Sequence, residues 1–193
     1  MVIGVLALQG AFREHRLMLE HIGCEVRLVR HPHDLDGLAG LVLPGGESTA
    51  IAKLMALHGL YDPIRVAHAR GMAVFGTCAG AILMARAING ARPDQEPLGL
   101  MDVVISRNAY GRQVDSFEVK VPFVGVPSGE VSATFIRAPR FTELGSQVEV
   151  LSRDIEGEPL AVREGRCLAV AFHPELTDDV AVHNFFITSI VGT

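Results

Sequence analysis

Residues 71–87 of the chain read GMAVFGTCAGAILMARA, and the rest of the sequence is organised around them. Gly71–Phe75 is short and apolar enough for a buried strand, and Ala81–Ala87 contains strong helix formers. Cys78 therefore lies where a strand is expected to turn sharply into a helix. The free N–H groups and the positive dipole end of that helix favour a thiolate. The pattern G-x-C-x-G is the cysteine form of a nucleophile elbow.

The segments before this elbow predict an α/β fold. Val2–Leu8 reads as a strand buried on both faces, Phe12–Ile22 as an amphipathic helix, and Glu25–Val29 as a strand nearer an edge. Leu41–Leu43 is the next buried strand, and the polar residues that begin at Glu47 are suited to starting a helix. The order strand, helix, strand is typical of a parallel sheet.

After Asn89 the pattern changes to alternating polar and apolar residues. Leu100–Val126 reads as an antiparallel ribbon. Later strands and a closing helix are expected at Val131–Ile136, Val148–Leu151, Pro159–Arg163, Cys167–Phe172 and Asp179–Ile190. We therefore expect an α/β protein with three layers, in which helices flank a mostly parallel central sheet with a small antiparallel addition. A length of 193 residues fits a single domain over residues 1–193.

Composition limits the classes of function. The formal net charge of −5 lacks the basic footprint of a nucleic-acid binder. The longest apolar run, around residues 72–85, is too short to span a membrane, and no basic region precedes the apolar N-terminus. A hydrophobic content of 49% suggests either a sheet covered on both faces or a further surface buried by a partner. We expect a soluble, cytoplasmic protein that acts on neither nucleic acid nor membrane.

The cysteines and histidines give no metal signal. Cys24, Cys78 and Cys167 form no C-x-x-C pair, which argues against a zinc site or a disulfide framework and fits a reducing compartment. His31 and His33 lie in a loop-like segment without a third ligand, so a solvated loop is the favoured interpretation. We expect no metal and no cofactor.

Four expected strand ends carry residues suited to chemistry, namely Gln9-Gly10, Gly45-Gly46, Cys78 and His173-Pro174-Glu175. Ligands of open α/β sheets bind beyond the carboxyl ends of the strands, so these residues can share one crevice. Residues two apart in an extended segment face the same way, which lets Glu175 reach one ring nitrogen of His173. A cysteine, a histidine base and a carboxylate that orients it are the set required for acyl transfer by a thiol.

Acyl transfer also requires donors for the developing oxyanion. The N–H groups of Ala79 and Gly46 are the two expected donors. Each signal taken alone has an ordinary explanation: a buried packing cysteine, a chance His-x-Glu on the surface, or a tight glycine turn. Their combination favours an active site.

Six blocks of the sequence carry a family resemblance: residues 6–12, 43–49, 76–80, 107–113, 135–139 and 172–177, which read LALQGAF, LPGGEST, GTCAG, RNAYGRQ, FIRAP and FHPELT. The elbow and the His-Pro-Glu motif resemble the class I, or triad, glutamine amidotransferases. The blocks at 43–49 and 107–113 are more specific and resemble the glutaminase subunits of pyridoxal 5'-phosphate synthases. The blocks run from the first strand to the last, so the resemblance covers essentially the whole chain.

This resemblance implies hydrolysis of L-glutamine to L-glutamate and ammonia through a thioester on Cys78. His173 would act as base and then acid, and Glu175 would orient it. The glutamine-contacting residues implied by the motif match are Gly46, Glu47, Ser48, Arg107, Ile136 and Arg137. Gln9 would lie near the oxyanion site. The implied partner is a synthase subunit that uses the ammonia to make pyridoxal 5'-phosphate, in a hetero-oligomeric complex.

Two other functions are compatible with parts of this sequence. A cysteine α/β-hydrolase acting on esters also uses a G-x-C-x-G elbow, but its acid lies between nucleophile and histidine in the chain, whereas Glu175 follows His173. A regulatory module that binds glutamine without cleaving it would not need Cys78, His173 and Glu175 together. Ammonia release from glutamine distinguishes all three hypotheses.

Overall fold

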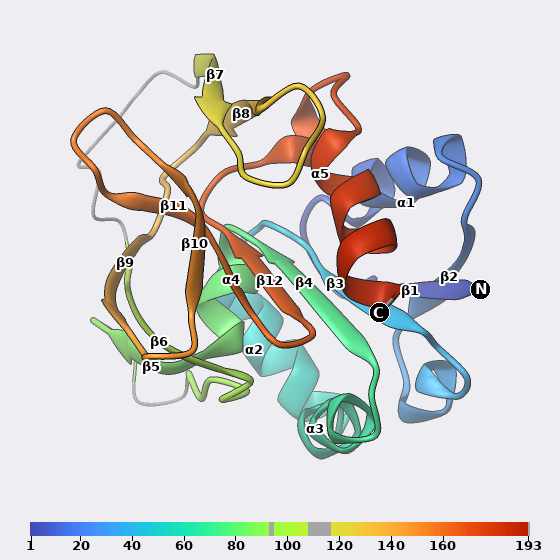
Figure 1. The fold of residues 1–193 in the computed structure, drawn as a ribbon. Coiled ribbons are helices and arrows are strands. Elements are labelled where there is room, and N and C mark those ends of the chain that lie inside the picture. Colours follow the sequence, from blue (N-terminus) through green and yellow to red (C-terminus); the bar gives the residue numbers. More distant parts are fainter. Residues whose placement is uncertain (93–94, 108–116, 193) are drawn as a thin grey trace.

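The computed structural model describes residues 1–92, 95–107 and 117–192 (Figure 1). Its centre is a seven-stranded sheet in the order β10-β11-β12-β4-β3-β1-β2. The strands are β1 (Val2–Leu6), β2 (Glu25–Val29), β3 (Gly40–Leu43), β4 (Ala73–Thr77), β10 (Glu149–Arg153), β11 (Pro159–Glu164) and β12 (Cys167–Val170). The strands from β12 to β2 run parallel, whereas β10 and β11 extend the sheet in antiparallel fashion.

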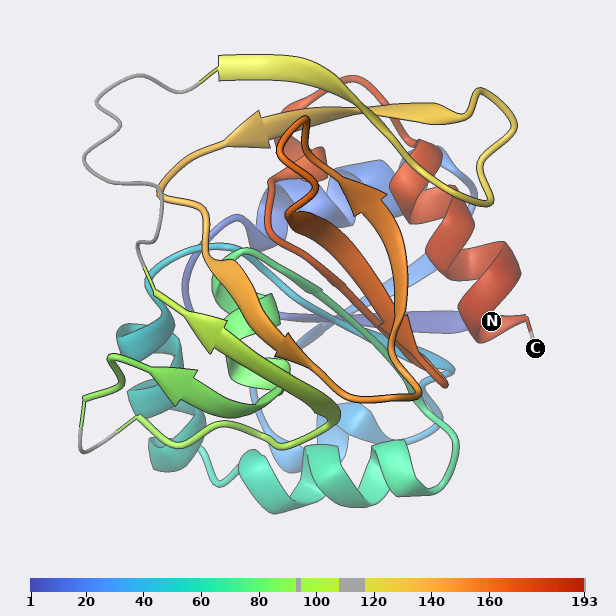
Figure 2. The ribbon, with the colours of Figure 1, turned by 60° about the vertical axis from the view of Figure 1, so that its left-hand side comes forward.

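Helices cover both faces of this sheet (Figures 1 and 2). One face carries α1 (Phe12–His21), α5 (Ala181–Phe185) and the π-helical segment Phe186–Val191; the other carries α2 (Ser48–Leu57), α3 (Tyr61–Ala69) and α4 (Ala79–Met84). Strand β3 shows why both faces must be covered. Val42 packs into the core beneath α1 and α5, while Leu41 and Leu43 pack into the core beneath α2, α3 and α4.

Two small sheets complete the fold at the end near β10 and β11 (Figure 2). One contains β5 (Ala85–Asn89), β6 (Met101–Ser106) and β9 (Arg140–Leu144), and the other is the antiparallel pair β7 (Phe117–Pro122) and β8 (Glu130–Phe135). The expected fold class, three layers with a mostly parallel sheet and an antiparallel addition, is confirmed. Among the described residues, no helix is both long and apolar enough to cross a membrane.

Several local predictions were wrong. The helix after the elbow ends at Met84, and Ala85–Ala87 belong to β5, because pairing with β6 outweighs the helix propensity of alanine. Leu100–Val126 is not one ribbon, since β6 pairs with β5 and β9 while β7 pairs with β8. Strand β9 was not predicted at all. His31–Asp36 is not a plain loop, because Pro32–Leu35 form a short 3₁₀ helix.

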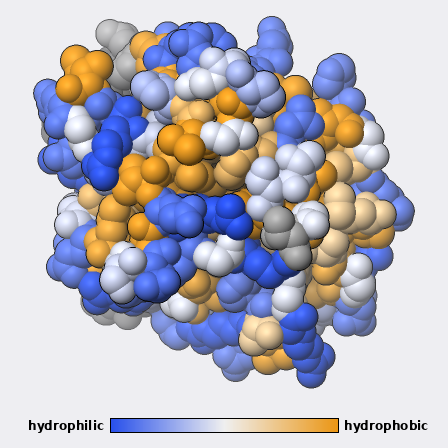
Figure 3. All heavy atoms as spheres, viewed as in Figure 1, coloured by the Kyte–Doolittle hydropathy of each residue, from blue (hydrophilic) through white to orange (hydrophobic). Residues whose placement is uncertain are grey.

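The high hydrophobic content is largely accounted for by the two cores, one on each face of the sheet. Apolar side chains also remain on the surface, including those of Ile155, Val124 and Leu57. Figure 3 shows hydrophobic atoms near the middle of one face, interspersed with hydrophilic residues.

Candidate active site

Cys78 forms a strained elbow between β4 and α4. Its backbone adopts φ 47° and ψ −100°, a region that a non-glycine residue enters only when the surrounding structure enforces it. Strand β4 continues through Thr77, two residues beyond the predicted end, so the turn begins at the cysteine itself. The side chain is 6% exposed, and its Sγ lies 3.8 Å from the carbonyl oxygen of Ile136. Backbone strain therefore presents the sulfur at the carboxyl end of the sheet.

His173 and Glu175 follow β12, the strand next to β4. The Nδ1 atom of His173 lies 2.8 Å from Oε1 of Glu175, and the two residues are 7% and 4% exposed. The predicted contact is made, although a 3₁₀ turn over Pro174–Leu176, and not an extended segment, brings the two side chains together. The backbone N–H of His173 donates to the Thr134 carbonyl of β8 over 2.8 Å.

The end of β3 packs directly against the histidine ring. A side chain at Gly45 would collide with Cε1 of His173 and would lie 3.2 Å from Oε1 of Glu175. A glycine at this position thus leaves space for the His173 ring and its carboxylate partner.

The electrostatics of the site favour a protonated His173. Burial by itself lowers the pKa of an imidazole, but hydrogen bonds to Cys78 and Glu175, together with their charges, raise the pKa of His173 to about 10. Because Nδ1 faces Glu175, the other ring nitrogen is the one available to Cys78. Burial raises the pKa of Glu175, yet the neighbouring His15 and His173 lower it below its ordinary value overall. The arrangement is suited to an imidazolium beside a nucleophilic sulfur.

One cavity of about 370 Å³ joins the sulfur to the predicted substrate residues. Its lining includes Gly46, Glu47, Ser48, Cys78, Ala79, Ile82, Arg107, Ile136, Arg137 and His173. This volume lies within the range of about 300–1,000 Å³ that is usual for small-molecule sites. The structure therefore brings together all six predicted glutamine-contacting residues with Cys78 and His173, while Glu175 lies behind the histidine.

Glu47 and Arg107 form a charged pair at the wall of this cavity. Glu47 caps α2 by accepting from the backbone N–H of Ala50 at 2.8 Å and of Thr49 at 3.3 Å. Its Oε1 also lies 3.3 Å from Nη2 of Arg107. Burial raises the pKa of Glu47, but these backbone bonds and the Arg107 charge outweigh it and lower the pKa below its ordinary value.

Gln95 is a polar residue of the site that the sequence patterns did not reveal. It is 4% exposed, donates from Nε2 to Oγ of Ser48 at 2.9 Å, and accepts from Nη1 of Arg107 at 2.6 Å. It therefore links two of the predicted substrate residues. No local pattern marks this glutamine, because it lies in a stretch rich in proline, glycine and charge whose position depends on the fold.

The expected oxyanion residues lie around the Gly45–Gly46 turn. The Gly45 carbonyl accepts from the Ala11 N–H at 2.9 Å, and a trans peptide directs its C=O and the next N–H to opposite sides, so the Gly46 N–H points away from Ala11. The Gln9 side chain is held beside this turn, because its Oε1 accepts from the Glu47 N–H at 2.9 Å. A side chain at Gly46 would lie 2.6 Å from the same oxygen.

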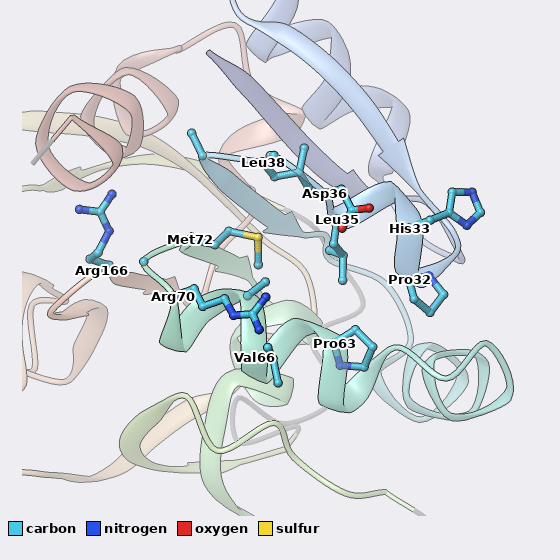
Figure 4. A pocket seen from close by; sticks show the side chains of 14 residues that line it. Pro32, His33, Leu35, Asp36, Leu38, Pro63, Val66, Arg70, Met72 and Arg166 are labelled. Atoms are coloured by element: carbon cyan, nitrogen blue, oxygen red, sulfur yellow. The ribbon is translucent and has the colours of Figure 1, made fainter.

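A larger hollow of about 610 Å³ lies elsewhere and contains none of these residues (Figure 4). Its lining includes Ala39, Met72 and Arg166, which directly precede β3, β4 and β12. It therefore lies at the amino ends of the parallel strands, away from the elbow. In the described ranges, no group of three or more His, Cys, Asp or Glu side chains is arranged to hold a metal ion. The predicted block at 107–113 is described only at Arg107, and its other residues lie outside the described ranges.

Comparison with known proteins gives consistent matches along the chain. The model of the SNO glutamine amidotransferase family matches residues 5–192. A Frankia casuarinae protein named pyridoxal 5'-phosphate synthase subunit PdxT is 52% identical over 188 residues, covering 97% of this chain and 94% of the relative. A Deinococcus radiodurans protein of the same name is 50% identical over 190 residues, covering 97% and 96%. A solved structure described as a glutamine amidotransferase superposes with a TM-score of 0.92 at 46% identity and covers 100% of both chains.

Proposed function

Because the chain belongs to the SNO glutamine amidotransferase family, we propose that it hydrolyses L-glutamine to L-glutamate and ammonia. One observation carries this proposal: a single small cavity contains the sulfur of Cys78, the ring of His173 and a charged pair suited to an amino acid. The reaction follows from the geometry of these groups.

In the first half of the reaction, the Cys78 thiolate attacks the side-chain amide carbon of glutamine. The carbonyl oxygen becomes an oxyanion, which the N–H groups of Ala79 and Gly46 stabilise. The imidazolium of His173 then gives its proton to the amide nitrogen, the carbon–nitrogen bond breaks, and ammonia leaves. A thioester on Cys78 and a neutral imidazole remain.

In the second half, the neutral His173 removes a proton from water, and the resulting hydroxide adds to the thioester carbonyl. The tetrahedral intermediate collapses, the carbon–sulfur bond breaks, and glutamate leaves with the thiolate restored. Glu175 accepts from Nδ1 of His173 throughout, which keeps the ring in one orientation and stabilises its positive charge.

The charged pair at the cavity wall suits the head group of an α-amino acid. The Glu47 carboxylate can accept from an α-ammonium group, and the guanidinium groups of Arg107 and Arg137 can donate to an α-carboxylate. Gln95 holds Arg107 and Ser48 in place from behind. Ile136 contributes its backbone near the sulfur. A simple ester offers no comparable charges, which disfavours the hydrolase alternative.

We further propose that the ammonia passes to a synthase subunit that makes pyridoxal 5'-phosphate. The support is that the Frankia and Deinococcus relatives are named as subunits of pyridoxal 5'-phosphate synthase. A hetero-oligomeric complex in the cytoplasm is the setting that this proposal predicts. The described cysteines are all free thiols, which is compatible with a reducing compartment.

The test measures ammonia release from L-glutamine by the purified chain, alone and with a pyridoxal 5'-phosphate synthase subunit. We expect turnover with glutamine and none with a simple ester, and co-elution of the two subunits in size-exclusion chromatography. Ester cleavage without glutamine cleavage would instead establish a hydrolase. Glutamine binding without turnover in either condition would establish a sensor.

A further inference from the structure

A series of buried polar side chains continues behind Glu175, on the side away from the cavity. His15 of α1 and His183 of α5 are both 0% exposed, and Nδ1 of His15 lies 2.9 Å from Nε2 of His183. The other nitrogen of His15, Nε2, lies 3.0 Å from Oγ1 of Thr77 and 3.5 Å from Oε2 of Glu175. The proposed reaction uses none of His15, Thr77 and His183.

This arrangement provides the second oxygen of Glu175 with a polar neighbour. Oε1 accepts from Nδ1 of His173 at 2.8 Å and lies 3.5 Å from the Thr77 hydroxyl. Oε2 is buried and has no hydrogen-bond partner among the described residues; its contact is with Nε2 of His15. A buried carboxylate stays ionised only where polar groups replace the lost water. The ionised form of Glu175 therefore depends on His15 as well as on His173.

The charge of the carboxylate determines where the protons of this network lie. A carboxylate attracts an N–H and repels a ring lone pair, so Nε2 of His15 carries the proton and Nδ1 accepts from Nε2 of His183. Burial lowers the pKa of His15 despite the opposing charge of Glu175. Burial, with the nearby His15, lowers the pKa of His183 to about 3. Burial therefore favours the neutral form of both rings.

We propose that His15 is a positioning residue of the catalytic triad. Its Nε2–H donates to the Thr77 hydroxyl, which in turn donates to Oε1 of Glu175, and the same nitrogen lies 3.5 Å from Oε2, so that the carboxylate stays ionised and oriented toward His173. Thr77 and His183 contact the two nitrogens of the His15 ring and fix its orientation. This inference rests on the proposed glutaminase reaction. Its effect on the Cys78–His173 pair exists without substrate, and that allows a separate test.

The first experiment measures the rate at which iodoacetamide alkylates Cys78 as a function of pH, followed by peptide mass spectrometry in a Cys24→Ser chain. The titratable groups that face Glu175, His173 or the two rings behind Glu175 are Glu14, His15, Cys78, His173, Asp179 and His183. Losing the His15 N–H removes a group that stabilises the ionised Glu175 carboxylate, and this in turn destabilises the His173 imidazolium that favours the Cys78 thiolate. We expect His15→Leu to move the midpoint of the curve of alkylation rate against pH upward by about one pH unit.

Three further variants separate this role from simple packing. The amide nitrogen of glutamine reaches the place of Nε2, whereas that of asparagine reaches the place of Nδ1, so His15→Gln should restore the midpoint and His15→Asn should not. Leu19→Ala is the matched control, because Leu19 is also fully buried on α1. It should lower stability and leave the midpoint unchanged. Should His15→Leu fail to fold, Thr77→Val removes the hydroxyl at nearly constant volume and should move the midpoint in the same direction.

The second experiment is a double-mutant cycle on glutamine turnover, measured with the synthase subunit present. His15→Leu should lower kcat/KM about 10-fold, comparable to losing a group that orients a functional histidine through a hydrogen bond. In a Glu175→Gln chain the same change should have no further effect. An additive loss, or an alkylation midpoint that His15→Leu leaves unmoved while Glu175→Gln shifts it, would overturn the proposal. Absence of ammonia release by the unmodified chain would reject the glutaminase function, while the alkylation experiment would still decide the role of His15.

Discussion

Cys78 and Cys167 each lie beside a histidine ring, Cys78 at the carboxyl end of the parallel strands and Cys167 at the first residue of β12, at the amino end of that strand. Cys167 Sγ lies 3.6 Å from Nε2 of His68 and 3.7 Å from the Leu100 carbonyl, and the residue is 0% exposed. Burial, and to a smaller extent the charge of Glu164, raises the pKa of this thiol to about 12. A cysteine next to a histidine is therefore not sufficient for a nucleophile.

The Cys78–His173 pair differs from the Cys167–His68 pair in two respects. The ring of His173 is oriented by a carboxylate, whereas Nδ1 of His68 contacts the Met72 backbone carbonyl at 2.9 Å. A carboxylate stabilises an imidazolium by its full charge, and a neutral carbonyl does so only by its dipole. In addition, Cys78 lines a cavity at a strained elbow, while Cys167 is fully buried at the start of a regular strand. We therefore expect a reactive cysteine to require both a histidine held by a carboxylate and a cavity that admits the substrate.

The largest expected effect comes from removing each sulfur in turn. Cys78→Ala should lower glutamine turnover by about 10⁴-fold or more, because no thioester can form. Cys167→Ala should leave turnover unchanged. Ammonia release assayed with the synthase subunit measures both, and circular dichroism checks that each variant is folded. Substantial activity in folded Cys78→Ala would rule out the thioester mechanism.

The next effect comes from the group that orients each histidine. Glu175→Gln should lower kcat about 10³-fold, since the amide carries no charge and favours the wrong ring tautomer. The matched variant is His68→Gln, which alters the other pair and should keep full turnover. Equal losses in the two variants would mean that general destabilisation, not the triad, explains the effect.

Alkylation distinguishes the two sulfurs without any substrate. In a folded Cys24→Ser chain at pH 7, iodoacetamide should modify Cys78 about 100-fold faster than Cys167, because the buried thiol of Cys167 remains protonated. Peptide mass spectrometry gives both rates in one sample. In denaturant the two rates should become equal, and a difference that persists there would have to come from local sequence.

The pH dependence of stability provides a further contrast. Because the pKa of His173 is raised from 6.5 to about 10, the native state holds a proton that the unfolded state releases between these values. This stabilisation is fully present below pH 6.5 and is lost as the pH rises through about 10, with a slope of at most about 1.4 kcal/mol per pH unit. Urea unfolding at several pH values measures it, and Glu175→Gln should flatten the slope.

The smallest expected effect is on the free energy of unfolding at pH 7. Here the substitution of Cys167 should cost more than that of Cys78, which is the reverse of their effects on activity. Cys167→Ala should lower the free energy of unfolding by about 1 kcal/mol, because its sulfur fills space in the core. Cys78→Ala should lower it less, since its sulfur borders a cavity. Chemical denaturation of both variants decides the order.

Much of the site was predictable because its residues come directly after strands that bury both faces. Such strands are short apolar runs, and the residues just beyond their carboxyl ends lie at one edge of the sheet. Glu25–Val29 and the start of α1 at Phe12 were predicted at the observed positions. Gln95 and His15 were not predicted as parts of the site, because each belongs to it only through contacts with residues far away in the sequence.

The errors in the fold have a similar physical origin. Ala85–Ala87 favour a helix locally, and only the partner strand β6 makes them extended. Strand β9, with the sequence RFTEL, has Phe141 as its single buried residue and so lacks a periodic pattern. Pairing between β6 and β9 joins segments separated by more than thirty residues, which local patterns do not encode.

The segment at the end of β8 contacts both residues that we propose to react, His173 and Cys78. The Thr134 carbonyl accepts a hydrogen bond from the His173 backbone N–H, and two residues later the Ile136 carbonyl faces the Cys78 sulfur. The strand β8 and the two residues that follow it therefore form one continuous support for His173 and Cys78. A displacement of the β7–β8 hairpin along its own axis would shift both contacts together, so the hairpin couples the position of one residue to that of the other.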